Sequence, residues 1–106
     1  MKPVASIVLA VGLILSCGAS AFSLDAVADG KTVYEQKKCQ LCHSIAGVGN
    51  KKSPLDGVGS KLKPEEIRKW IIAPKEMKAD TRMKAYPEIT GKALDDLMEY
   101  MLSLTK

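Results

Sequence analysis

Two cysteines and the only histidine of the chain stand together in one five-residue string. The string reads Cys39-Gln40-Leu41-Cys42-His43. Thiols at this spacing can add to the two vinyl groups on one edge of a porphyrin, and the adjacent imidazole can then bind the iron. The pattern is therefore typical of covalent haem attachment. We expect Cys39 and Cys42 to form the thioethers and His43 to be an axial ligand of the iron.

Three other kinds of site use the same cysteine spacing. A thioredoxin-like redox motif follows a strand, whereas residues 30–38 have the pattern of a helix. A closed zinc site needs four ligands, and the chain has one histidine and only one further cysteine, Cys17, in a segment expected to direct export. A simple disulfide at this spacing closes a small loop and stabilises little. Haem attachment is therefore the favoured interpretation.

A methionine thioether is a common second axial ligand in haem electron carriers. Met98 and Met101 lie on an apolar stripe of helical period, where methionines usually fill the core. Met77 follows Pro74 near the end of a predicted helix. Met83 lies in a polar segment between two predicted helices, where a loop can present its sulfur to a fixed iron. We therefore favour Met83 as the second ligand, with Met77 as the alternative.

Three helices are predicted to position these side chains. The first covers about residues 30–38 and ends at the cysteine motif. The second begins near Pro64, preceded by a lysine that is a poor N-cap, and ends at the next proline. The third covers about residues 92–103, with Thr90 as its N-cap. Between the first two lies a turn-rich loop, 44–61, and no segment alternates convincingly as a strand. We expect an all-α fold of three to four helices around one haem.

The first residues have the pattern of a secretory signal peptide, which we assign to residues 1–21. An apolar run over residues 4–15 is followed by an Ala-Ser-Ala cleavage site ending at Ala21. Two alternatives stay open: Cys17 could be the lipidated first residue of a lipoprotein, or the segment could remain as an uncleaved anchor. In each case the working domain, residues 22–106, is exported. We expect it in the periplasm, or lipid-anchored at the outer face of a membrane.

Composition limits the class of protein and its partners. The chain has 106 residues, of which 46% are hydrophobic, and its net charge is +4. This is one globular domain, and it is small enough to need a disulfide, a metal or a large cofactor for stability. A modestly basic surface suits an acidic partner or an anionic membrane. Dispersed lysines with one Phe and one Trp do not indicate a nucleic-acid-binding protein.

From residue 29 to residue 106 the chain resembles class I monohaem cytochromes c. Gly30 and Tyr34 match the small and aromatic pair of that family's N-terminal helix. Tyr100 stands at the matching aromatic position of the C-terminal helix. The resemblance implies that these two helices cross.

The same resemblance implies roles for three further regions. Pro54 resembles the proline whose carbonyl region receives the ring N–H of the proximal histidine. Trp70 resembles the aromatic residue that often lies near a haem propionate. The segment from Met83 to Pro87 resembles the distal methionine loop, with Lys84 where a proline is usual.

The function implied is that of a one-electron carrier with one covalent haem c, His/Met ligation and no catalytic residues, and therefore not an enzyme. We expect a monomer that exchanges electrons with redox proteins bearing acidic docking surfaces. The alternative is a membrane-tethered haem subunit of a larger oxidase or dehydrogenase. Cations flanking the attachment motif and the distal loop would steer such partners: Lys37, Lys38, Lys51, Lys52, Lys75, Lys78, Arg82 and Lys84.

Overall fold

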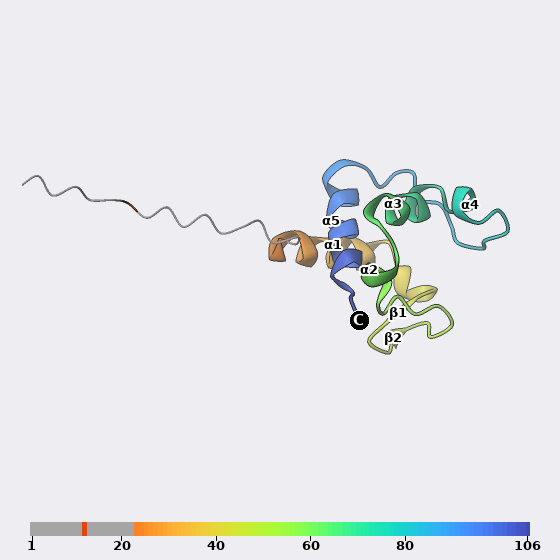
Figure 1. Cartoon of the computed structure of the whole chain (residues 1–106). Coiled ribbons are helices and arrows are strands. Elements are labelled where there is room, and N and C mark those ends of the chain that lie inside the picture. The colour runs from red at the N-terminus through yellow and green to blue at the C-terminus, as the bar shows by residue number, and fades with distance from the viewer. Residues whose placement is uncertain (1–11, 13–22) are drawn as a thin grey trace, which may run out of the picture.

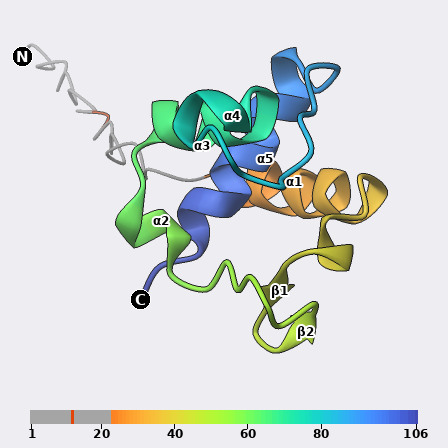
Figure 2. The same cartoon turned by 90° about the vertical axis from the view of Figure 1, so that its right-hand side faces the viewer.

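The computed structural model describes residues 12 and 23–106. Apart from residue 12, the assigned signal peptide therefore lies outside the described residues, and so do its cleavage site and Cys17. The described part is mostly helical, which confirms the predicted fold class (Figures 1 and 2). Its elements in chain order are α1 (Leu24–Gln36), the 3₁₀ turn η1 (Cys39–Leu41), β1 (Ser44–Ile45), β2 (Val48–Gly49), α2 (Val58–Lys61), α3 (Pro64–Ile72), α4 (Pro74–Met77) and α5 (Gly91–Ser103).

Helices α1 and α5 cross each other and form the centre of the fold (Figure 2). Gly30 lies at the crossing, where a Cβ atom would overlap the carbonyl oxygen of Asp96 and come within 2.7 Å of Tyr100 Cβ. One turn further along α1, the rings of Tyr34 and Tyr100 meet edge to face, with centroids 5.7 Å apart and planes at 73°. This geometry is favourable for aromatic pairs. The helix crossing implied by the family resemblance is thus confirmed.

The start of the first helix was predicted wrongly. Helix α1 begins at Leu24, six residues before the predicted start. Ser23 is its N-cap, because the Ser23 side chain accepts a hydrogen bond from the Ala26 N–H at 3.4 Å. At the other end, Lys38 adopts a left-handed φ of 58°, which turns the chain out of the helix and into η1.

The predicted loop over residues 44–61 contains three short elements. Strands β1 and β2 form an antiparallel hairpin, and Ser44 also bridges to Pro54. Helix α2 packs on α5 at Gly59, where a Cβ atom would overlap the backbone of Leu102. Two-residue strands and a four-residue helix are too short to leave a periodic signal in the sequence, which is why they were missed.

Helix α3 begins at Pro64, as predicted, although Lys63 is a poor N-cap. The carboxylate of Glu66 accepts a hydrogen bond from the Lys63 N–H at 2.9 Å and so caps the helix start. Pro74 follows the end of α3 and begins α4. Helix α5 starts one residue before the prediction. Thr90 is the N-cap residue, as predicted, although its hydroxyl makes no capping hydrogen bond, and the following glycine adopts a left-handed φ of 58°.

The core lies between α1, α3 and α5 and is built mainly from aliphatic and methionine side chains. Ile67 and Ile71 of α3 face Leu97 and Met101 of α5, and all four are buried. Within residues 23–106, none of the helices has the length and hydrophobicity needed to span a bilayer.

Candidate functional site

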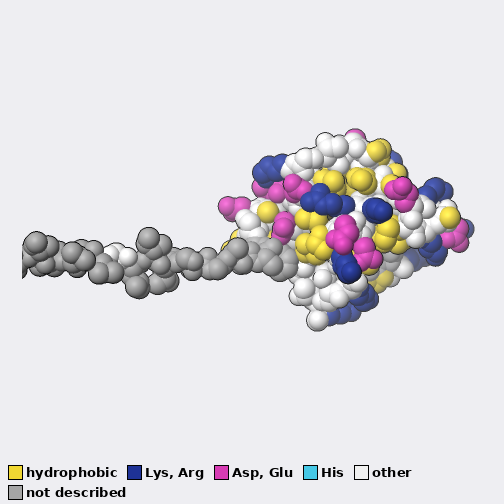
Figure 3. All heavy atoms as spheres, turned by 45° about the horizontal axis from the view of Figure 1, so that its top comes forward, with side chains coloured by type: hydrophobic (Ala, Val, Ile, Leu, Met, Phe, Trp, Pro, Cys, Tyr) yellow, Lys and Arg dark blue, Asp and Glu magenta, His cyan; other side chains and the backbone are white. Residues whose placement is uncertain are grey.

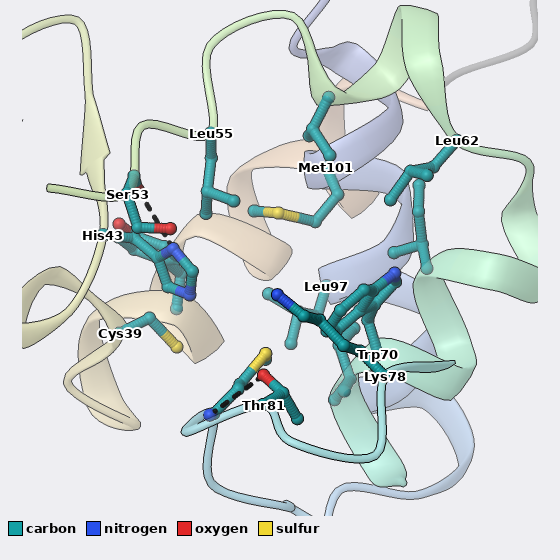
Figure 4. Close-up of a pocket in the computed structure, with 15 residues that line it drawn as sticks. Cys39, His43, Ser53, Leu55, Leu62, Trp70, Lys78, Thr81, Leu97 and Met101 are labelled. Carbon is teal, nitrogen blue, oxygen red and sulfur yellow. Dashed lines mark hydrogen bonds between the residues drawn. The ribbon is translucent and has the colours of Figure 1, made fainter. Parts of the chain in front are cut away.

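An apolar cavity of about 350 Å³ opens beside this core (Figure 4). Its walls come from α1, η1, α3 and α5 and from the loops on either side of them. A neighbouring hollow of about 290 Å³ shares five lining residues with it, so the two are parts of one site. The shared residues are Cys39, His43, Ser53, Thr81 and Met83.

The turn η1 presents the cysteine motif to this site. The N–H groups of Cys42 and His43 both donate to the carbonyl oxygen of Cys39, at 3.1 and 2.9 Å. The tight turn places the Cys39 sulfur against the cavity (Figure 4), while Cys42 is exposed and lines the neighbouring hollow. Both cysteines are free thiols. Two thiols and an imidazole therefore border one space, as covalent attachment of a porphyrin requires.

The imidazole of His43 is oriented by a backbone carbonyl. Its Nδ1 lies 3.0 Å from the carbonyl oxygen of Ser53 and donates to it (dashed line in Figure 4). A proton held on Nδ1 leaves Nε2 as the lone-pair donor for a metal, and this hydrogen bond is the usual way a ligating histidine is fixed. The accepting carbonyl belongs to Ser53, the residue before Pro54. Pro54 itself is not among the residues that line either hollow.

Two of the four candidate methionines face the cavity. Met83 is half-buried and lines both hollows, and its N–H donates to the Thr81 hydroxyl at 3.2 Å. Met77 and Met98 line neither. Met101 was predicted as core, and it is 6% exposed, yet Figure 4 shows its sulfur directed into the cavity. The helical stripe could not distinguish a core position from a cavity wall, because both are apolar.

The wall opposite His43 in Figure 4 carries two N–H donors. Trp70 of α3 is half-buried and lines the cavity. Lys78 lines it too, and its nitrogen end points inwards. Sequence reasoning placed Lys78 among the surface cations and missed this position, since a lysine next to other lysines carries no signal that distinguishes it.

Burial changes the proton affinity of two groups at this site. It raises the pKa of the Cys39 thiol. It also raises the pKa of Tyr34 to about 12, with smaller contributions from Cys39 and Tyr100. A thiol with a raised pKa supplies little thiolate at neutral pH, and thiolate is the reactive form in disulfide exchange. Burial therefore disfavours a thiol–disulfide reaction that begins at Cys39.

The residues present fit a covalently bound haem. The cavity is apolar, and thiols, an imidazole and a thioether stand on its walls, a donor set that suits haem iron. Among the described residues, no cluster of three or more His, Cys, Asp or Glu side chains could hold another metal ion.

Comparison with known proteins defines the class of protein. The family described as "Cytochrome C oxidase, cbb3-type, subunit III" matches residues 25–101. The chain belongs to this family of c-type cytochromes. Members carry covalently bound haem c and transfer electrons to and from redox proteins, and domains of this class are typically exported.

A curated relative has a related description. The chain is 27% identical over 84 residues to "Cytochrome c oxidase subunit 2" of Alkalihalophilus pseudofirmus. The match covers 71% of this chain and 25% of that protein. The chain thus spans about a quarter of the length of this relative.

Proposed function

We propose that this chain is a one-electron carrier whose haem is bound covalently by Cys39 and Cys42 and ligated by His43 and Met83. It would shuttle electrons between redox proteins in the periplasm after removal of residues 1–21. The observation that carries the proposal is that the imidazole and the thioether line the same cavity, with the imidazole already oriented by Ser53.

When bound, the haem supplies an iron that gains and loses one electron. The thioether of Met83 is a soft ligand that favours the reduced iron. The apolar walls act in the same direction, because the oxidised haem has one more positive charge and burial penalises charge. The hydrogen bond to Ser53 holds the His43 ring in one orientation in both states. With His43 and Met83 both holding the iron, no position would be open to a substrate, so the chain would act as a carrier and not as an enzyme.

The two other residues to which the family resemblance gave a role, Pro54 and Trp70, would serve the same site. Trp70 would donate its indole N–H to a haem propionate, since a half-buried Trp N–H needs an acceptor. Pro54 would set the backbone of the loop whose carbonyl at Ser53 orients the histidine. Both roles concern the position of the haem and its first ligand.

Replacement of Met83 by Ala tests the ligand assignment. The chain is expressed in a host with c-type cytochrome maturation, and absorption spectra are recorded with and without carbon monoxide. The wild type should be low-spin, with a ferric methionine–iron charge-transfer band and no response to carbon monoxide. Met83→Ala should lose the band, bind carbon monoxide, and lower the potential by more than about 59 mV, a tenfold change in equilibrium.

Met77→Ala is the matched control and should keep the wild-type spectra. A wild type that binds carbon monoxide would indicate a sensor or an enzyme. A colourless protein with redox-active thiols would contradict the proposal entirely.

A basic surface around the attachment motif would steer acidic partners. Lys38, Lys51 and Lys52 are exposed, and among the described residues none of the three forms an ion pair. Leu41 and Val48 stand between Lys38 and Lys51 in the sequence and are 66% and 73% exposed. On the face shown in Figure 3, by contrast, cationic and anionic side chains are mixed. Exposed basic side chains without ion-pair partners, together with exposed apolar ones, suit a small, short-lived redox encounter.

Oxidation by small reagents measures this steering. The rate with hexacyanoferrate(III), an anion, should fall as ionic strength rises, and the rate with a cationic cobalt(III) complex should rise. The double variant Lys51→Gln/Lys52→Gln should lower the rate with hexacyanoferrate(III) about two- to fivefold at low salt. Lys31→Gln, on the exposed side of α1, is the control. If Lys31→Gln lowered the hexacyanoferrate(III) rate as much as the double variant does, the net charge of the protein alone would set the rate.

An oxidase subunit is the second candidate function, and both comparisons favour it, since both names describe oxidase subunits. In that case the chain would be tethered to a membrane by lipid on Cys17 or by an uncleaved anchor. Cell fractionation of the wild type and of Cys17→Ser separates these possibilities. Soluble periplasmic protein in both supports the shuttle. Membrane-bound wild type with soluble Cys17→Ser supports the lipid-anchored subunit.

A further inference from the structure

The backbone of Lys78 is held on both sides. Lys78 follows the last residue of α4, and its N–H donates to the carbonyl oxygen of Pro74 at 3.0 Å. Its own carbonyl oxygen accepts from the N–H of Thr81 at 3.1 Å. Pro74 is fully buried, so this anchor is part of the core. The direction in which the Lys78 side chain leaves the backbone is therefore fixed by the fold.

That direction takes the side chain to the cavity. Lys78 lines the larger hollow, and Figure 4 shows its nitrogen end pointing inwards. The residue as a whole is exposed, so the amine stands where the cavity meets water. Within residues 23–106, no carboxylate forms an ion pair with it. Lys75, on α4 itself, lines neither hollow, although it is close in sequence and equally charged.

A cation at the edge of an apolar cavity is better stabilised when an anion of the occupant pairs with it, because apolar walls solvate a charge less well than water does. Haem carries two carboxylates as its only anionic groups. We propose that Lys78 binds a haem carboxylate at the mouth of this cavity and thereby raises the reduction potential. This inference rests on the proposed function, because it requires the haem to occupy the site. It replaces the role in partner steering that the sequence suggested for Lys78.

The expected sign follows from charge. A free carboxylate stabilises the oxidised haem, which carries one more positive charge, and a paired ammonium cancels that effect. Removing the ammonium should therefore favour the oxidised state. The hydrogen bond to Thr81 adds a mechanical link, because Thr81 also accepts the N–H of Met83. Lys78 is thus a positioning residue that joins the haem edge to the segment carrying the second ligand.

Redox titration of Lys78→Gln and Lys75→Gln tests the proposal in the holoprotein. At the wild-type midpoint, the ratio of reduced to oxidised Lys78→Gln should fall about three- to tenfold, where tenfold corresponds to 59 mV. Lys75→Gln should change the ratio less than about 1.5-fold, because Lys75 lines neither hollow and a charge without a haem partner is screened by salt. Lys78→Arg should retain the wild-type potential. The shift in Lys78→Gln should persist at high ionic strength.

Equal shifts in Lys78→Gln and Lys75→Gln, or a shift that vanishes at high salt, would overturn the proposal. Low-spin spectra without a carbon monoxide response in the same samples show that the proposed function still holds, so the two failures are distinguishable. In addition, the resonance Raman band for propionate bending should move in Lys78→Gln and stay in place in Lys75→Gln.

Amine labelling tests the pairing of Lys78 in the wild-type protein, so the result does not depend on whether a variant folds. Acylation followed by mass spectrometry should modify Lys78 at least about threefold more slowly than Lys75 in the holoprotein, because an amine held against a haem carboxylate is less accessible to the reagent. Equal labelling rates would show that Lys78 is an ordinary surface lysine and would contradict the pairing.

Discussion

Replacement of both Cys39 and Cys42 by Ser is expected to leave the domain largely unfolded. The cavity is bordered by core side chains, including Leu97 of α5 and Ile67 of α3, which a bound haem would cover. A domain this small buries too little of its own apolar surface to be stable alone. A group bound only in the native state supplies the missing stability. Far-UV circular dichroism should show a loss of most helical signal.

Cys17→Ser is the control for this pair, because Cys17 lies outside residues 23–106. It should retain haem and unfold cooperatively. A cooperative thermal transition in the double variant, with helical content near that of the wild type, would show that the polypeptide folds without haem. In that case the haem would be needed for electron transfer and not for the stability of the fold.

Gly30→Ala is the second change with a large expected effect. A methyl group at this position would overlap the carbonyl oxygen of Asp96 and crowd Tyr100, so α1 and α5 would have to move apart. Backbone atoms cannot rotate away as a side chain can, and the expected loss is therefore about 3 kcal/mol, at the upper end for overpacking. Denaturant unfolding of the holoprotein, followed by the haem absorption, measures it.

The control is Lys31→Ala at the next position of α1, which is exposed. A surface change of this kind should alter stability by less than about 0.5 kcal/mol. Similar stabilities for Gly30→Ala and the wild type would mean that the two helices can separate at little cost. The crossing would then not be the rigid centre of the fold.

A sequence pattern can be recognised where a feature lies in consecutive residues or repeats with a clear period. The string from Cys39 to His43 is local, and α5 has a regular apolar stripe. The start of α1 was missed because its cap, Ser23, lies next to the segment assigned to export. The short elements within residues 44–61 repeat too few times to show any period.

Parts of the candidate site could not be predicted for a different reason. The carbonyl oxygen of Ser53 is a backbone atom that every residue has, so its bond to His43 leaves no trace in residue type. Lys78 is one basic residue among several, and only the bonds that fix its backbone separate it from Lys75. Met101 meets the cavity through a position that any core methionine would occupy.

The unequal exposure of the two thiols has a consequence for biogenesis. Cys42 is exposed, whereas Cys39 is half-buried against the cavity wall. In a chain that folded first, Cys42 would be open to the outside and Cys39 would be reached only through the cavity, and burial raises the pKa of Cys39 and so disfavours its reactive form. Both bonds are made readily only while the turn around them is still open. The order of events in the making of this protein is thus expected to be attachment first and folding afterwards.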